Sequence, residues 1–134
     1  MLCGGDCGNR EINLPETKIT AWDGYITLEP SDREIVVTID GVEVARSRDA
    51  LRLQESDYSA VYYIPRVDIN ETHLVPSGLR TQCKWKGEAQ YLSYQNGDVT
   101  LDNVVWMYPD ALDPVAPIRT LVSFAVGKVE ISEI

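Results

Sequence analysis

From Trp22 onward, apolar residues recur at about every second position, which is the period of a β-strand with one buried face. The alternation runs through residues 35–39 and 42–44 and is interrupted by Asp40-Gly41. It resumes in residues 88–95 and 98–105, on either side of Asn96-Gly97. Because Asp-Gly and Asn-Gly tolerate the positive φ angles of a tight turn, both interruptions predict β-hairpins.

Three further segments have the β-branched and aromatic composition that is typical of strands. The first is Ala60–Ile64, which Pro65 ends. The other two, Leu121–Val126 and Lys128–Ile131, predict a closing pair of strands around Gly127.

Helical signals are few. Ser47–Glu55 is either a short helix capped by Ser47 or a turn followed by a short strand. Asp113-Pro114 predicts a single helical turn through Arg119, with Pro at its first position. We therefore expect a mainly β chain, folded as a compact two-sheet sandwich or a partly open barrel of hairpins with one or two short helical turns.

Length and composition indicate one globular domain. The 134 residues are 44% hydrophobic and 25% charged, which suits a single core. Gly4, Gly5 and Gly8 interrupt any periodicity at the start, so we expect residues 1–20 to form a poorly ordered tail and residues 21–134 to form the domain. No apolar run approaches the roughly 20 residues of a membrane span, and the first residues do not resemble a secretory signal.

The charge balance excludes two classes of partner. Lys and Arg number 12 and Asp and Glu number 21, so the net charge is −9. Such a chain repels phosphate backbones and anionic membranes, and we expect neither nucleic acid nor membrane as a partner. The cysteines number three, an odd count that implies no disulfide framework. We expect a cytoplasmic protein.

The sequence does not favour a metal site. Cys3 and Cys7 could join Cys83 and the only histidine, His73, as zinc ligands, since thiolate and imidazole bind zinc. Structural zinc sites usually contain two closely spaced pairs of ligands, whereas only one such pair is present here. Glycine motifs that cradle phosphate are also absent. We expect no metal and no cofactor.

The segment Thr81–Tyr91 is the densest in reactive side chains. Lys84 and Lys86 lie near Cys83 in the sequence, and a neighbouring cation favours the thiolate. In an extended strand Cys83 and Lys86 would point to opposite faces, whereas a turn ending at Gly87 could bring them together. The alternative is that Cys83 is a small buried hydrophobe and both lysines are solvated.

Aromatic residues are concentrated in the middle and late strands, where strand pairing could gather them around a pocket. Many must also fill the core, because the chain contains a single Phe. Arg66 and Lys86 add positive charge, so the set suits a planar or anionic small molecule; an ion pair between Arg66 and Asp68 is the alternative. The aromatic residues are Tyr62, Tyr63, Trp85, Tyr91, Tyr94, Trp106 and Tyr108.

Three motifs follow one another along the chain. They are Tyr62-Tyr63-Ile64-Pro65-Arg66-Val67-Asp68, Thr81-x-Cys83-x-x-Lys86-Gly87-x-Ala89-x-Tyr91 and Trp106-x-Tyr108-Pro109. In this order they resemble the family called domain of unknown function 427, from about Trp22 to Val126. The resemblance implies a compact, mostly β domain without a settled activity. Members are sometimes labelled nucleotidyltransferase-like, but this chain lacks the Gly-Ser and paired-aspartate pattern of such enzymes.

These residues predict a small-molecule pocket, with catalysis left open. In an enzyme, Cys83 would be the nucleophile or acid/base, and Lys86 would favour its thiolate or anchor an anionic group. Tyr63 or Tyr108 would orient the substrate by hydrogen bonding. The alternatives are a non-catalytic ligand-binding module and a structural or interaction protein that forms a homodimer. Four more motif residues are expected to contact the ligand: Arg66, Thr81, Trp106 and Tyr108.

Overall fold

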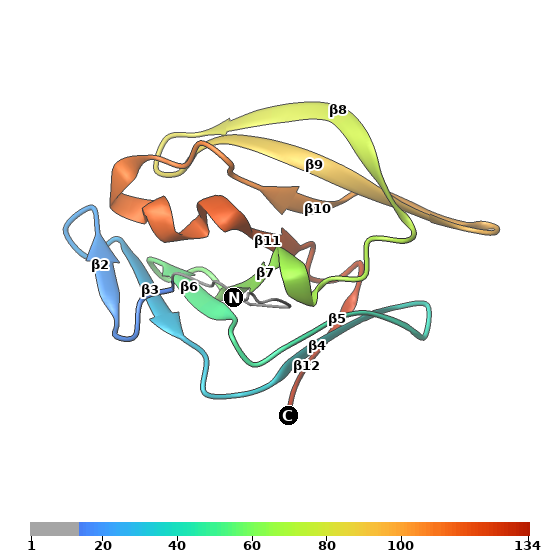
Figure 1. Ribbon diagram of the computed structural model, residues 1–134. Helices are drawn as coiled ribbons and strands as arrows, with labels where there is room; N and C mark the ends of the chain where they lie inside the picture. The colour runs from blue at the N-terminus through green and yellow to red at the C-terminus, as the bar shows by residue number, and fades with distance from the viewer. Residues whose placement is uncertain (1–13) are drawn as a thin grey trace, which may run out of the picture.

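The computed structural model describes residues 14–134, so the predictions for Cys3 and Cys7 lie outside the described residues. This part folds into an eight-stranded sheet, in the order β2-β3-β6-β7-β11-β10-β9-β8, and a three-stranded sheet, β12-β4-β5 (Figure 1). The expected mainly β fold with two sheets is confirmed, and within residues 14–134 neither sheet closes into a barrel. The strands are β2 (Ile19–Ala21), β3 (Ile26–Pro30), β4 (Ile35–Ile39), β5 (Val42–Ser47), β6 (Leu51–Glu55), β7 (Val61–Pro65), β8 (Leu74–Cys83), β9 (Gly87–Asn96), β10 (Val99–Met107), β11 (Leu121–Phe124) and β12 (Glu130–Glu133).

Both predicted hairpins form, with different turns. Asp40 and Gly41 join β4 to β5 with φ angles of 50° and 79°, as a type I′ turn requires. In the second hairpin Asn96 pairs with Val99, so the loop is Gly97-Asp98 and lies one residue later than predicted. Of these two residues only Gly97 has a positive φ, at 61°, and a positive φ at the first loop residue alone is the signature of a type II′ turn.

The sheet topology decides between two alternatives left open by the sequence and corrects one prediction. Residues 51–55 form β6, so the strand alternative holds and the helix does not. β11 and β12 do not pair with each other, because β11 lies between β7 and β10 whereas β12 pairs with β4. All four residues of β11 are buried, so this strand needs neighbours along both edges and both faces covered. The predicted tail also overlaps β2, which begins at Ile19.

The helical structure of residues 14–134 consists of two 3-10 helices, η1 (Arg66–Asp68) and η2 (Asp113–Thr120). η2 begins with Pro114 near its start, as predicted, but it extends beyond a single turn and bends at Val115. Its buried residues, Val115 and Ile118, pack against the large sheet. No helix in the described part of the chain is long and apolar enough to cross a membrane.

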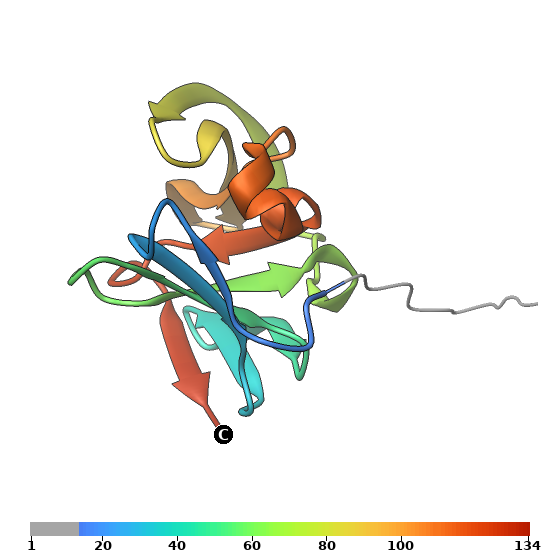
Figure 2. The ribbon, with the colours of Figure 1, turned by 90° about the vertical axis from the view of Figure 1, so that its left-hand side faces the viewer.

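Two clusters of apolar side chains cover opposite faces of the large sheet. One joins this sheet to the small one and contains Val37, Val105 and Phe124. The other lies under η2 and contains Leu28 and Tyr63. Figure 2 shows the small sheet on one side of the large sheet and η2 on the other. Adjacent residues of a strand therefore serve different clusters, and the face under η2 carries the site described below.

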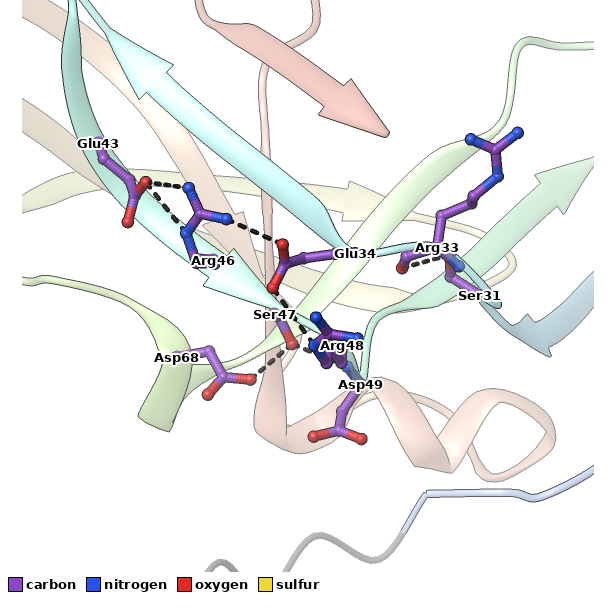
Figure 3. Close-up of polar contacts among 9 residues, drawn as sticks. All are labelled: Ser31, Arg33, Glu34, Glu43, Arg46, Ser47, Arg48, Asp49 and Asp68. Carbon is purple, nitrogen blue, oxygen red and sulfur yellow. Dashed lines mark hydrogen bonds and ion pairs between the residues drawn. The ribbon is translucent and has the colours of Figure 1, made fainter. Parts of the chain in front are cut away.

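Polar contacts hold the end of β5 against η1 (Figure 3). The buried Ser47 donates through Oγ to Asp68 Oδ2 at 2.5 Å and accepts from the Asp49 backbone N–H at 3.0 Å. Nearby, Arg46 forms 2.8 Å ion pairs with both Glu34 and Glu43. The Arg46 side chain is half-exposed, so these pairs add little stability, whereas the buried Ser47 hydroxyl depends on its partners.

Candidate functional site

The two ends of the large sheet meet through aromatic side chains. Trp85, in the turn between β8 and β9, packs on Tyr25 with ring centroids 4.7 Å apart and on Trp22 at 5.6 Å. Trp22 also donates through Nε1 to the backbone oxygen of Trp85 at 2.9 Å. β2 and β8 are the outermost strands of this sheet, so contacts between their turns require it to curl strongly (Figure 1).

A cavity of about 470 Å³ opens on the η2 side of the curled sheet. Its volume lies within the range of small-molecule pockets, about 300–1,000 Å³. Five of its lining residues are aromatic and two are charged. The lining residues are Leu53, Glu55, Tyr58, Ser59, Val61, Tyr63, Lys86, Tyr91, Asn103, Trp106 and Tyr108.

Strand register explains which side chains reach the cavity. Leu53 pairs with Val61 across β6 and β7, and Trp106 pairs with Tyr91 across β10 and β9. Directly paired residues of adjacent strands point to the same face. Tyr63 lines the cavity although only 1% of it is exposed, so it lies at the base, whereas Tyr58, at 68%, lies at the mouth.

A buried ion pair forms the polar part of the wall. Lys86 Nζ lies 2.6 Å from Glu55 Oε1, and the two side chains are only 11% and 22% exposed. Lys86 Nζ also lies 5.8 Å from the centre of the Tyr108 ring. Because Lys86 and Glu55 are the two charged residues of the lining, the formal charge of the wall sums to zero.

The β8–β9 turn positions Lys86. Its backbone N–H donates to the Cys83 oxygen at 3.3 Å, and its own oxygen accepts from Leu112 N–H at 3.0 Å. Gly87 follows with a φ of 110°, a conformation that L-residues with a side chain rarely adopt. The turn predicted to end at Gly87 is therefore present, and it directs the Lys86 side chain to Glu55.

Two tyrosines in the cavity wall are protonated at neutral pH. Burial is the main cause that raises the pKa of Tyr63 well above its ordinary value, and Tyr108 adds to this. Burial also raises the pKa of Tyr108, and the nearby Cys83 contributes. Trp106 Nε1 donates to the Tyr63 hydroxyl at 3.2 Å. Both phenols therefore keep an O–H that can donate a hydrogen bond.

The cavity brings together four of the residues predicted from the sequence, Tyr63, Lys86, Trp106 and Tyr108. Thr81 is exposed and lies outside the lining, with its Oγ1 2.8 Å from the hydroxyl of the lining residue Tyr91. Cys83 is half-buried and packs against the apolar cluster under η2, outside the lining. The Lys86 ammonium binds Glu55, whereas the sequence leaves open whether Lys86 turns toward Cys83 or away from it.

Arg66 lies away from the cavity. It belongs to η1, forms a 2.8 Å ion pair with Glu71, and contacts Met107 Sδ at 3.6 Å. Met107 packs in the cluster between the two sheets, on the face of β10 opposite to Trp106. Asp68, the alternative partner expected for Arg66, accepts from Ser47 instead. The structure therefore places Arg66 outside the lining of this cavity, and its contact with a ligand stays a prediction from the sequence.

Sequence reasoning missed Glu55 and Asn103. The signal for Glu55 is its spacing, because it continues the buried face of Leu51 and Leu53 with a charged residue. Asn103 has a positive φ of 55° and lies at the irregularity of β10 between Leu101 and Val105. Nothing in the strand pattern marks that bulge, so Asn103 could be placed only by the structure.

The fold and the cavity define a mainly β protein with an aromatic small-molecule-sized pocket on one face of a curled sheet. The family model described as "Domain of unknown function (DUF427)" matches residues 27–133, and the chain belongs to that family. The matched region includes every residue that lines the cavity. Among curated proteins, none matches the chain.

Proposed function

We propose that this protein binds a neutral, planar small molecule in the cavity on the η2 side of the large sheet. The observation that carries the proposal is a buried Lys86–Glu55 ion pair in the wall of an otherwise largely aromatic cavity of about 470 Å³. Pockets of this kind combine apolar walls with a few polar groups that orient the ligand. The ammonium keeps further N–H donors and the carboxylate keeps further lone pairs, so both remain able to bind a ligand.

Charge favours a neutral ligand over an anionic one. Glu55 compensates Lys86 within the wall, and the whole chain carries a net charge of −9. An anion entering the cavity would have to compete with the Glu55 carboxylate for Lys86 and would meet like charge. The aromatic rings of Trp106, Tyr91 and Tyr108 favour a flat partner, because stacked and edge-to-face contacts add to the area buried.

Tryptophan fluorescence and melting temperature test the proposal. The probes are chromone, quinoline and naphthalene as neutral bicyclic compounds, with 2-naphthoate as the anionic comparison. We expect the neutral probes to raise the melting temperature by mass action and to change the emission of Trp106, with 2-naphthoate weaker. Trp106→Phe should abolish the fluorescence change, whereas Trp85→Phe, outside the lining, should retain it. Absence of any effect from all three neutral probes at millimolar concentration would overturn the proposal.

An enzyme that uses Cys83 as nucleophile is the alternative of a different class. Two observations favour the binding function: Cys83 stands outside the lining, and Lys86 is engaged by Glu55. Once a compound is found that the protein converts, loss of turnover in a folded Cys83→Ser variant would restore the catalytic role. In either case we expect a cytoplasmic protein. A dimer measured in solution, with no response to any probe, would instead favour an interaction protein.

A further inference from the structure

The hydroxyl of Tyr63 has one hydrogen-bonding capacity that the protein leaves unused. Its oxygen accepts from Trp106 Nε1 at 3.2 Å, but no acceptor for its own proton is found within residues 14–134. The side chain is 1% exposed and lines the cavity. Buried tyrosine hydroxyls usually find a partner, so the proton at the base of the cavity points to an acceptor on the ligand.

Tyr108 presents a second donor in the same wall. It is 7% exposed, and its hydroxyl forms no hydrogen bond with any side chain or backbone group of the described chain. Tyr63 and Tyr108 line the same cavity and pack in the same apolar cluster of the large sheet. Both remain protonated at neutral pH, so the wall of this one cavity offers two O–H donors without a partner among the described residues.

We propose that Tyr63 and Tyr108 donate together to one carbonyl oxygen of a conjugated planar ligand, an inference that rests on the proposed function. A carbonyl oxygen has two lone pairs and accepts two donors. The hydrogen bond from Trp106 polarises the Tyr63 hydroxyl and makes it a better donor. An anionic oxygen fits less well, since Glu55 is part of the same wall. The ligand class is therefore a neutral cyclic ketone, lactone or lactam fused to an aromatic ring.

Paired probes separate the carbonyl contact from the aromatic contacts. Chromone carries a conjugated carbonyl, and naphthalene has a similar two-ring shape without one. We expect the wild-type protein to bind chromone more tightly, and Tyr63→Phe and Tyr108→Phe each to weaken chromone by about three- to tenfold without changing the affinity for naphthalene. Tyr62→Phe is the matched control, because Tyr62 lies on the opposite face of β7 and bonds Glu133.

The carbonyl stretch of isotope-labelled chromone gives a second readout in the wild-type protein. Two hydrogen bonds should shift it to lower frequency than in an apolar solvent, and each Phe variant should reverse part of that shift. If chromone binds but its affinity and carbonyl frequency are the same in wild type and both Phe variants, this inference is overturned while the proposed function stands. Equal losses for chromone and naphthalene in the Phe variants also overturn it. If no neutral probe binds the wild-type protein, the proposed function is overturned, and the inference about the carbonyl group is overturned with it.

Discussion

Replacing Lys86 by Met would remove the buried ammonium while keeping a side chain of similar length, and would leave the Glu55 carboxylate without its cation. Losing one partner of a fully buried ion pair destabilises a protein by about 3–5 kcal/mol, whereas exposed pairs contribute about 0–1 kcal/mol. The Lys86 and Glu55 side chains are 11% and 22% exposed, so we expect a loss between the exposed and the fully buried ranges, about 2–3 kcal/mol.

The double variant separates the energy of the Lys86–Glu55 interaction from the effect of changing each side chain alone. Combining Lys86→Met with Glu55→Gln removes both charges, so the loss should be smaller than the sum of the single losses by about 1–3 kcal/mol. Urea unfolding of all four proteins gives these free energies, provided that the slopes with denaturant agree. Arg46→Met is the control. Arg46 is 47% exposed and pairs with Glu43 and Glu34, and Glu34 keeps Arg48 as a second partner, so this change should alter stability by less than about 1 kcal/mol. A Lys86→Met loss equal to that of Arg46→Met, with additive single losses, would refute the reasoning.

Three further predictions follow from individual residues. Gly87→Ala should lower the free energy of unfolding by about 2 kcal/mol, because alanine is strained at a φ of 110° although its Cβ would meet only ordinary contacts. Gly97→Ala should lower it by about 1 kcal/mol, because the φ of 61° at Gly97 lies in the left-handed helical region. Equal losses for the two variants in urea unfolding would contradict this reasoning. The raised pKa of Tyr63, caused mainly by burial, means that above about pH 10 the unfolded chain releases the proton and the folded chain keeps it. Stability should therefore be complete below that pH and fall above it by up to about 1.4 kcal/mol per pH unit from this group, and Tyr63→Phe should flatten the decline in urea midpoints between pH 9 and 11; parallel declines would show that Tyr63 does not contribute. Cys83→Ala should change the affinity for chromone by less than about twofold relative to the wild-type protein, because Cys83 lies outside the cavity lining. If the variant folds but no longer binds chromone, Cys83 contributes to the binding site.

The sequence by itself indicated seven of the eleven strands in the described residues, both hairpins and four of the eleven residues that line the cavity. Period-two alternation and the Asp-Gly and Asn-Gly pairs are local signals, since they reflect the pleat of one strand and the φ angles of one turn. The same kind of signal placed Gly87 at the end of the β8–β9 turn. Residue type also selected Tyr63, Lys86, Trp106 and Tyr108, because a concentration of aromatic side chains near a lysine suits a pocket wall.

Only the tertiary structure decided which strands are neighbours and which charges meet. β11 and β12 are adjacent in sequence but belong to different sheets, because a strand buried on every side must enter the centre of a sheet. Lys86 and Glu55 are 31 positions apart and come together only when the sheet curls. Neither residue type by itself predicts this contact. The chemistry of Arg66 and Cys83 also suggested a site, but the tertiary structure places both outside the cavity lining. Arg66 lies in η1, where it pairs with Glu71, and Cys83 packs beside the cavity. Long-range pairing depends on how whole faces are buried, and that information is shared among many residues.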